Sequence, residues 1–273
     1  FYPSIRFSML LALITSLAIV AVVPLIPKMG FEQKLIAPVQ DYMLITAFST
    51  FGAYLHACLK EFLQAYEIVV FPNVVTFFCV FLNVVLNLTF VFGVGPIPSL
   101  GVIGLAIASL LVRYFMGFAL LIYCFINMTF RNYKEKEYYQ SMLKIGMPIS
   151  LAVLVEFVAF NSIAILMGRV SGLYAAAQNL VCTLTTISFM VPFAISNAIA
   201  VKVGFANGSD NYEDLKKYSF FGTVLSVSFM ICSAIVFTSF APHLVRIFTS
   251  DASLVKIAVP IMYILSIFQV FDG

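Results

Sequence analysis

Long apolar segments separated by short polar ones run along the whole chain. Eight segments reach about 20 residues or more, which is the length of helix that crosses the hydrocarbon core of a bilayer: 7–27, 41–59, 72–94, 101–128, 146–166, 174–203, 220–241 and 255–273. They lack the strict alternation of transmembrane barrel strands. A helix also satisfies its backbone polar groups within the segment, as the bilayer interior requires. The pattern therefore predicts an all-α polytopic bundle with eight transmembrane helices.

The composition agrees with this prediction. Hydrophobic residues make up 62% of the chain and charged residues 10%, against roughly 45–50% and about 25% in soluble globular proteins. The net charge of +3 fits the basic residues that membrane proteins place in cytoplasmic loops, so it gives no reason to expect nucleic acid as a partner. We expect an integral protein of the plasma membrane, the inner membrane of a bacterium.

The longest polar interruption, FRNYKEKEYYQSMLK, divides four of the apolar segments from the other four. We therefore expect three parts: residues 1–129 with four transmembrane helices, a cytoplasmic linker or interfacial helix over 130–145, and residues 146–273 with four more. The chain begins without a methionine and stops inside an apolar run. We interpret it as the interior of a longer protein.

The sequence offers little of the chemistry that an enzyme needs. The five cysteines fall singly inside apolar segments, and the two histidines, His56 and His243, are far apart. Cysteines in this pattern are typical of packing residues. No glycine-rich run that could cradle a phosphate is present, so we expect no ATP-driven step and no bound cofactor. A membrane-embedded enzyme stays a formal alternative without a visible nucleophile, base or metal cluster.

One carboxylate stands out, because Glu156 lies near the middle of the apolar segment 146–166. A charge at mid-bilayer costs about 2.5–3.5 kcal/mol on insertion scales, so such residues usually face a cavity or a partner and have a function. A low-dielectric surrounding favours the neutral form of a carboxylic acid. That property suits a group that takes up a proton or exchanges it for another cation. A purely structural glutamate, held by hydrogen bonds between helices, remains the alternative.

Other polar side chains also interrupt the apolar segments. Asp272 lies at the end of the chain, with Gln269 three residues earlier on the same helical face. Asn83 and Asn87 share a face of the third segment and could either bind neighbouring helices or offer amide oxygens to a cation; packing is the better-supported interpretation from the residues alone. Arg113 lies deep enough in the fourth segment to need a partner, water or a path to the interface.

Several stretches resemble a known family. GMPISLAVLVEF and AAAQNLVCTLTTISFMVPFAISNAIAVKVGFANG resemble the seventh and eighth helices of multidrug and toxic compound extrusion (MATE) transporters. VVFPNVVTFFCVFLNVVLNLTFVFGVGPIPSLGVIGLAIAS is similar to their fifth helix and the start of the sixth, and FQVFDG to part of the tenth. The resemblance implies a twelve-helix fold in two six-helix lobes around a central cleft, of which this chain would supply eight helices, the third to the tenth.

The resemblance also implies roles for individual residues. Glu156 matches the glutamate of the family's seventh helix and Asp272 the aspartate of its tenth, and both are associated with cation coupling in the carboxy-terminal lobe. Asn83, Asn87 and Ser109 match a polar cluster of the amino-terminal lobe. Some relatives have aspartate at the second asparagine, so this chain departs from the pattern there.

The implied activity is antiport, in which an inward Na⁺ or H⁺ gradient expels small cationic or amphipathic substrates while the lobes alternate between two open states. Na⁺ or H⁺ would then be the coupling ion, and membrane lipid would surround the protein. Phe268 occupies a position where some Na⁺-coupled relatives have tyrosine. A flippase for lipid-linked saccharides stays open as an alternative. Its cleft is expected to carry several cationic side chains, whereas Arg113 is the only one in the interior of an apolar segment; Lys202 and Lys256 lie one residue from the ends of theirs.

Overall fold

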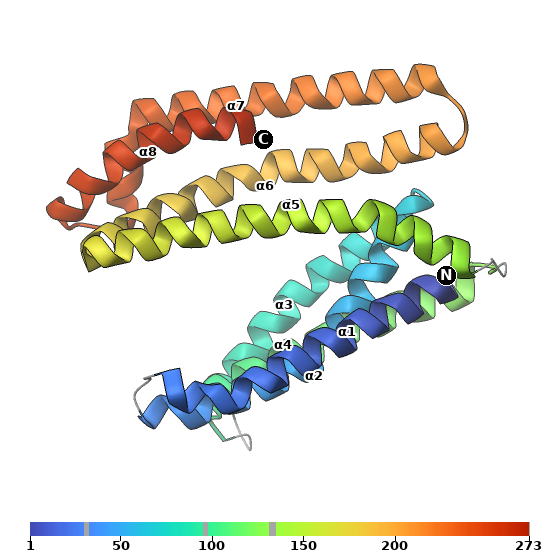
Figure 1. Ribbon diagram of the computed structural model, residues 1–273, viewed down its shortest axis with the longest axis horizontal. Coiled ribbons are helices and arrows are strands. Elements are labelled where there is room, and N and C mark those ends of the chain that lie inside the picture. Colours follow the sequence, from blue (N-terminus) through green and yellow to red (C-terminus); the bar gives the residue numbers. More distant parts are fainter. Residues whose placement is uncertain (30–32, 95–97, 131–134, 273) are drawn as a thin grey trace. The chain divides into compact units, whose positions relative to one another are not determined.

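The computed structural model describes residues 1–29, 33–94, 98–130 and 135–272. Every regular element in this described part is helical (Figure 1). Eight of these helices are long and apolar enough to cross a membrane, which confirms the predicted all-α membrane chain. In chain order the elements are α1 (Tyr2–Val22), the 3-10 helix η1 (Val23–Met29), α2 (Gln33–Ala65), α3 (Val70–Phe92), α4 (Val102–Asn127), α5 (Glu135–Val170), α6 (Gly172–Gly208), α7 (Tyr212–Phe248) and α8 (Ala252–Asp272).

Several helices extend well beyond their apolar segments. Helices α5, α6 and α7 contain 36, 37 and 37 residues, so at 1.5 Å per residue each is longer than the roughly 30 Å of hydrocarbon. The polar flanks therefore continue as helix. Helix α5 begins at Glu135, inside the segment 130–145 that the sequence marks as a linker or interfacial helix. Helix α7 begins after Asn211, whose side-chain oxygen accepts a hydrogen bond from the backbone N–H of Asp214 at 3.2 Å.

The chain divides into two compact units, Phe1–Met142 and Leu143–Gly273. The division falls inside the polar segment 130–145. The finer assignment of 1–129 and 146–273 to two lobes of a larger transporter stays a prediction. Each unit is described here by itself.

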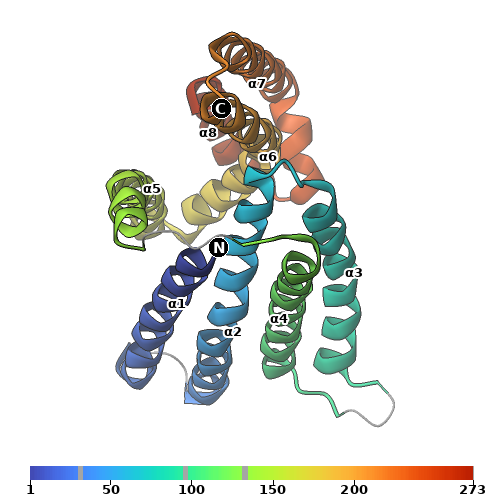
Figure 2. The same cartoon turned by 90° about the vertical axis from the view of Figure 1, so that its right-hand side faces the viewer.

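The first unit is a row of helices in the order α1, α2, α4, α3 (Figure 2). Glycines allow the central pair to approach closely. A Cβ atom added to Gly117 would lie 3.2 Å from the backbone oxygen of Gly52 on α2. Small residues at a helix interface permit this kind of backbone contact in membranes. Toward one end of the pair a core of buried side chains forms from Leu55, Leu59, Leu63, Leu120 and Cys124.

Arg113 links the two central helices of this unit. Its Nη1 atom on α4 donates a hydrogen bond of 2.6 Å to the hydroxyl oxygen of Ser49 on α2. The Ser49 hydroxyl in turn donates to the backbone oxygen of Thr46 at 2.9 Å, and Ser49 is only 1% exposed. The sequence left open whether Arg113 has a partner, contacts water or reaches the interface. The structure shows a partner, Ser49, on the neighbouring helix.

Replacing Ser49 by alanine should destabilise this unit, because the half-buried guanidinium of Arg113 would lose an acceptor. A hydrogen bond lost from a buried polar group costs about 1–3 kcal/mol of unfolding free energy. Ser162→Ala is the matched control, since that exposed hydroxyl donates only to the backbone of its own helix, at Val158. Thermal unfolding of the full-length protein in detergent measures both variants. Equal unfolding temperatures for the two would show that the Arg113 contact contributes little.

The second unit has a tightly packed part and an open part. Helices α6, α7 and α8 contact one another around a buried core of Ala177, Val181, Leu184, Phe237, Ala241, Val245, Ala258 and Met262. Helix α5 meets α6 at the turn of Ser171, whose hydroxyl oxygen caps α6 by accepting the backbone N–H of Leu173. None of the described α5 side chains is buried. The space between α5 and the other helices therefore stays open.

Candidate functional site

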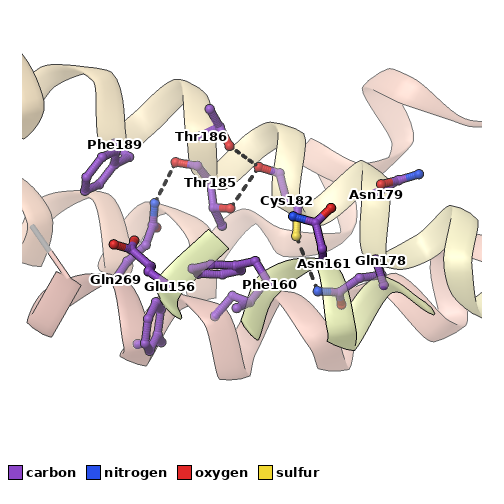
Figure 3. A pocket seen from close by; sticks show the side chains of 13 residues that line it. Glu156, Phe160, Asn161, Gln178, Asn179, Cys182, Thr185, Thr186, Phe189 and Gln269 are labelled. Atoms are coloured by element: carbon purple, nitrogen blue, oxygen red, sulfur yellow. Dashed lines mark hydrogen bonds between the residues drawn. The ribbon is translucent and has the colours of Figure 1, made fainter. Parts of the chain in front are cut away.

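A cavity of about 330 Å³ lies in the second unit between α5, α6 and α8 (Figure 3). Its volume falls within the range of small-molecule pockets, about 300–1,000 Å³. All three helices are candidate membrane spans. The residues that line the cavity are Glu156, Phe160, Asn161 and Ala164 from α5, Gln178, Asn179, Cys182, Thr185, Thr186 and Phe189 from α6, and Leu265, Phe268 and Gln269 from α8.

Glu156, the carboxylate that the sequence singles out, belongs to this lining. Within the described part of the chain, no hydrogen bond or ion pair engages its side chain. The alternative of a glutamate held by bonds between helices therefore gains no support in this unit. An unpaired carboxylate beside a cavity is instead available to a mobile cation.

Helix α6 supplies a polar stripe that the sequence interpretation missed. Gln178, Cys182, Thr185 and Phe189 follow one another at intervals of four, three and four residues, so they share one helical face. In the structure this face lines the cavity. The spacing was a usable signal, but nothing in the sequence distinguishes a cavity-lining face from one that packs against a neighbour.

Three phenylalanines, one from each helix, give the cavity an aromatic character. They are Phe160 on α5, Phe189 on α6 and Phe268 on α8. The rings of Phe160 and Phe268 meet edge to face with their centroids 6.0 Å apart. The faces of such rings carry negative electrostatic potential and attract organic cations.

The carboxyl end of α8 contributes Gln269, which is 3% exposed. Its amide nitrogen donates a hydrogen bond of 2.9 Å to the backbone oxygen of Thr185 on α6. Asp272, the second predicted coupling carboxylate, is the last residue of α8, but its side chain lies outside the described part of the structure. The proposed pairing of Asp272 with Glu156 therefore stays a prediction.

The predicted polar cluster of the first unit is only partly assembled. The amide nitrogen of Asn87 donates to the side-chain oxygen of Asn83 at 2.9 Å, one turn away on α3. The Asn87 side-chain oxygen is buried without a partner among the described residues. Ser109 is half-buried on α4, the helix that packs against α3, and no hydrogen bond within the described part joins it to the pair. Its membership of the cluster stays a prediction.

The chain is similar in sequence to bacterial proteins named for multidrug resistance. The chain is 25% identical over 276 residues to "Multidrug resistance protein NorM" of Aliivibrio fischeri, an alignment that covers 96% of this chain and 60% of the relative. It is 27% identical to "Probable multidrug resistance protein NorM" of Mesorhizobium japonicum, with 90% of this chain and 55% of the relative covered. The chain thus spans somewhat more than half the length of these relatives.

Solved structures show the same fold. A point mutant of the Vibrio cholerae MATE transporter VcmN matches with a TM-score of 0.88 at 16% identity, over 97% of this chain and 61% of that one. The eukaryotic MATE transporter AtDTX14 matches with a TM-score of 0.83 at 18% identity, over 99% and 61%. The MatE family model matches residues 1–89 and 148–273. The chain is therefore an integral membrane protein that belongs to the MATE family of transporters.

Proposed function

We propose that the full-length protein is a secondary active antiporter that exports organic cations or drugs in exchange for Na⁺ or H⁺. The observation that carries the proposal is a carboxylate, Glu156, without a partner among the described residues, on a cavity lined by three candidate membrane-spanning helices. Membership of a transporter family argues against a membrane-embedded enzyme. The names of the relatives, as multidrug resistance proteins, support export of xenobiotics.

The lining of the cavity favours a positively charged substrate. Glu156 supplies negative charge and the phenylalanines supply aromatic faces, and no described residue of the lining carries a positive charge. A cationic substrate and a coupling ion would then compete for the same carboxylate. Binding of the ion would release the substrate, and departure of the ion would leave the carboxylate free to bind the next substrate.

Two further elements belong to the proposal. Asp272 would share the coupling role with Glu156 from the end of α8. The polar side chains of the first unit, Asn83, Asn87 and Ser109, would contribute a second polar site. In the family's twelve-helix arrangement, the two lobes would alternate between inward-open and outward-open states around the bound cation.

The test is transport by the full-length protein reconstituted in liposomes. We expect an imposed Na⁺ or pH gradient to drive a fluorescent organic cation against its own gradient, and collapse of the driving gradient with an ionophore to stop it. Exchanging one gradient for the other identifies the ion. No gradient-driven movement of any organic cation would contradict the proposal and favour the saccharide-lipid flippase alternative, which labelled lipid-linked saccharide in the same liposomes tests directly.

A further inference from the structure

The second unit has a further cavity at the turn that joins α7 to α8 (Figure 1). Its volume is about 480 Å³, within the range of small-molecule pockets. Two residues of its lining carry a positive charge, and no described residue of the lining carries a negative one. The cavity is therefore opposite in charge to the one that contains Glu156. Its lining consists of Arg246, Thr249, Ser250, Ala252, Val255 and Lys256.

Both positive charges of this cavity lack a partner among the described residues. No hydrogen bond or ion pair in that part of the chain engages the guanidinium of Arg246 or the ammonium group of Lys256, and both residues are exposed. The acidic residue of the turn, Asp251, lies outside the cavity lining. Its Oδ1 atom accepts a hydrogen bond of 2.8 Å from the backbone N–H of Ser253. The two cations are therefore available to an external anion.

The helix dipole accounts for one of these cations but not for the other. Arg246 lies in the last turn of α7, where the partial negative charge of a helix end favours a basic side chain. Lys256 is the fifth residue of α8, near the end of that helix where the dipole disfavours a positive charge. An anion bound in the cavity would compensate the charge of Lys256.

Two hydroxyl groups add hydrogen-bond donors to the lining. The Thr249 hydroxyl oxygen accepts the backbone N–H of Asp251 at 3.2 Å, which leaves its own proton for another acceptor. The Ser250 hydroxyl takes part in no hydrogen bond within the described part of the chain. Phosphate oxygens are acceptors that arginine and lysine side chains bind strongly. The lining therefore suits a phosphate group.

The cavity lies where membrane lipid can reach it. Helices α7 and α8 are both candidate membrane spans, so the turn that joins their ends lies at the membrane surface. The two residues before Thr249, Ile247 and Phe248, are 74% and 52% exposed, and apolar side chains at this level suit contact with acyl chains. A phospholipid would use both the cationic cavity and the apolar surface beside it, whereas a free phosphate ion would use only the cavity.

We propose that this cavity binds the phosphate headgroup of an anionic phospholipid. Arg246 and Lys256 hold the negative charge, and the hydroxyls of Thr249 and Ser250 donate to the phosphate oxygens. The bound lipid thereby joins the end of α7 to the beginning of α8. This site requires neither a particular transported substrate nor a particular coupling ion, so it stands or falls independently of the proposed antiport.

The experiment measures lipid binding to the purified full-length protein in detergent by native mass spectrometry. Phosphatidylglycerol, which is negatively charged, is compared with phosphatidylcholine, which has no net charge. A basic side chain near an anionic headgroup contributes roughly fivefold in affinity. We expect wild type to prefer phosphatidylglycerol, and Arg246→Gln and Lys256→Gln each to weaken its binding roughly fivefold, with roughly 25-fold weakening when the two are combined.

Two further variants separate a specific site from general surface charge. Arg169→Gln removes one positive charge from an exposed position in the last turn of α5, outside the cavity lining, and should bind phosphatidylglycerol like wild type. Asp251→Asn keeps a side-chain oxygen for the backbone N–H of Ser253 but removes the negative charge of the turn. It should strengthen binding several-fold, a gain that misfolding would not produce. Thermal unfolding without added lipid identifies any variant that fails to fold.

The outcomes distinguish the lipid from other ligands. Unchanged phosphatidylglycerol binding in the folded double variant, or equal weakening by Arg169→Gln, would overturn the site. Glycerol phosphate or inorganic phosphate that binds as tightly as the lipid, and displaces it, would overturn the lipid as occupant and identify a free phosphate as the ligand. Equal affinity of wild type for phosphatidylcholine and phosphatidylglycerol would overturn the role of the two cations.

Discussion

Replacing Glu156 by glutamine should abolish gradient-driven export while leaving the protein folded. Glutamine keeps the size of the side chain but removes the negative charge of Glu156, the one carboxylate among the described residues that line the cavity. Coupling free energies between two ligands are typically about 1–3 kcal/mol, or roughly 5- to 150-fold in affinity. We therefore expect the effect of the driving ion on substrate affinity to fall by that factor, and export to fall to the level of passive leak.

The comparison variant is Glu213→Gln, which removes the same charge from an exposed position in the first turn of α7. It should transport like wild type. Binding of the fluorescent cation is measured with and without the driving ion. An affinity that no longer depends on the ion shows that coupling has been lost, whereas an unchanged dependence shows that only the transport rate has fallen. Export by Glu156→Gln at the wild-type rate would make Glu156 a structural residue. The coupling role would then pass to Asp272 or to the polar side chains of the first unit.

The second large effect concerns stability and the contact between α2 and α4. A Cβ atom at Gly52 would lie 2.8 Å from the backbone nitrogen of Tyr114 and 2.9 Å from the backbone carbon of Arg113. Backbone atoms cannot move aside as the end of a flexible side chain can. Overpacking typically costs about 1–3 kcal/mol, so Gly52→Ala should lower the unfolding temperature of the full-length protein clearly, and Gly52→Leu still further.

Gly204→Ala is the control for this prediction, because a Cβ atom there meets no other atom within 4 Å. Alanine favours a helix over glycine by roughly 0.5–1 kcal/mol, so this variant should unfold at the same or a higher temperature. The two substitutions are chemically identical and should move the unfolding temperature in opposite directions. A shift of the same sign and size in both would show that α2 and α4 can separate at little cost.

Much of the fold could be predicted because it depends on local properties of the chain. Each apolar segment is long enough to force a membrane-spanning helix, and the hydrogen bond from Asn87 to Asn83 follows from their spacing of one helical turn. The segment 130–145 shows the limit of such reasoning. Its polar residues predicted a cytoplasmic linker or an interfacial helix but did not show that residues 135–145 form one continuous helix, α5, with the apolar segment that follows; the linker assignment stays a prediction.

The candidate site could be predicted only in part. The position of Glu156 in the middle of an apolar segment was sufficient to mark it, since a charge there requires a physical explanation. Nothing comparable in the sequence marks the residues whose oxygen atoms line the cavity. Threonine and glutamine are common on packed helical faces, and only their actual hydrogen bonds show which atoms remain free.

The sequence by itself determined the number of helices, their membrane location and the identity of the central carboxylate, because hydrophobic length and helical periodicity act within a single segment. The tertiary structure decided which distant residues meet. It pairs Arg113 with Ser49, 64 positions away, and places Gln269 against Thr185, 84 positions away. These contacts depend on how helices pack, on glycines that admit close approach, and on donors already engaged elsewhere. Each of these is a property of the assembled helices.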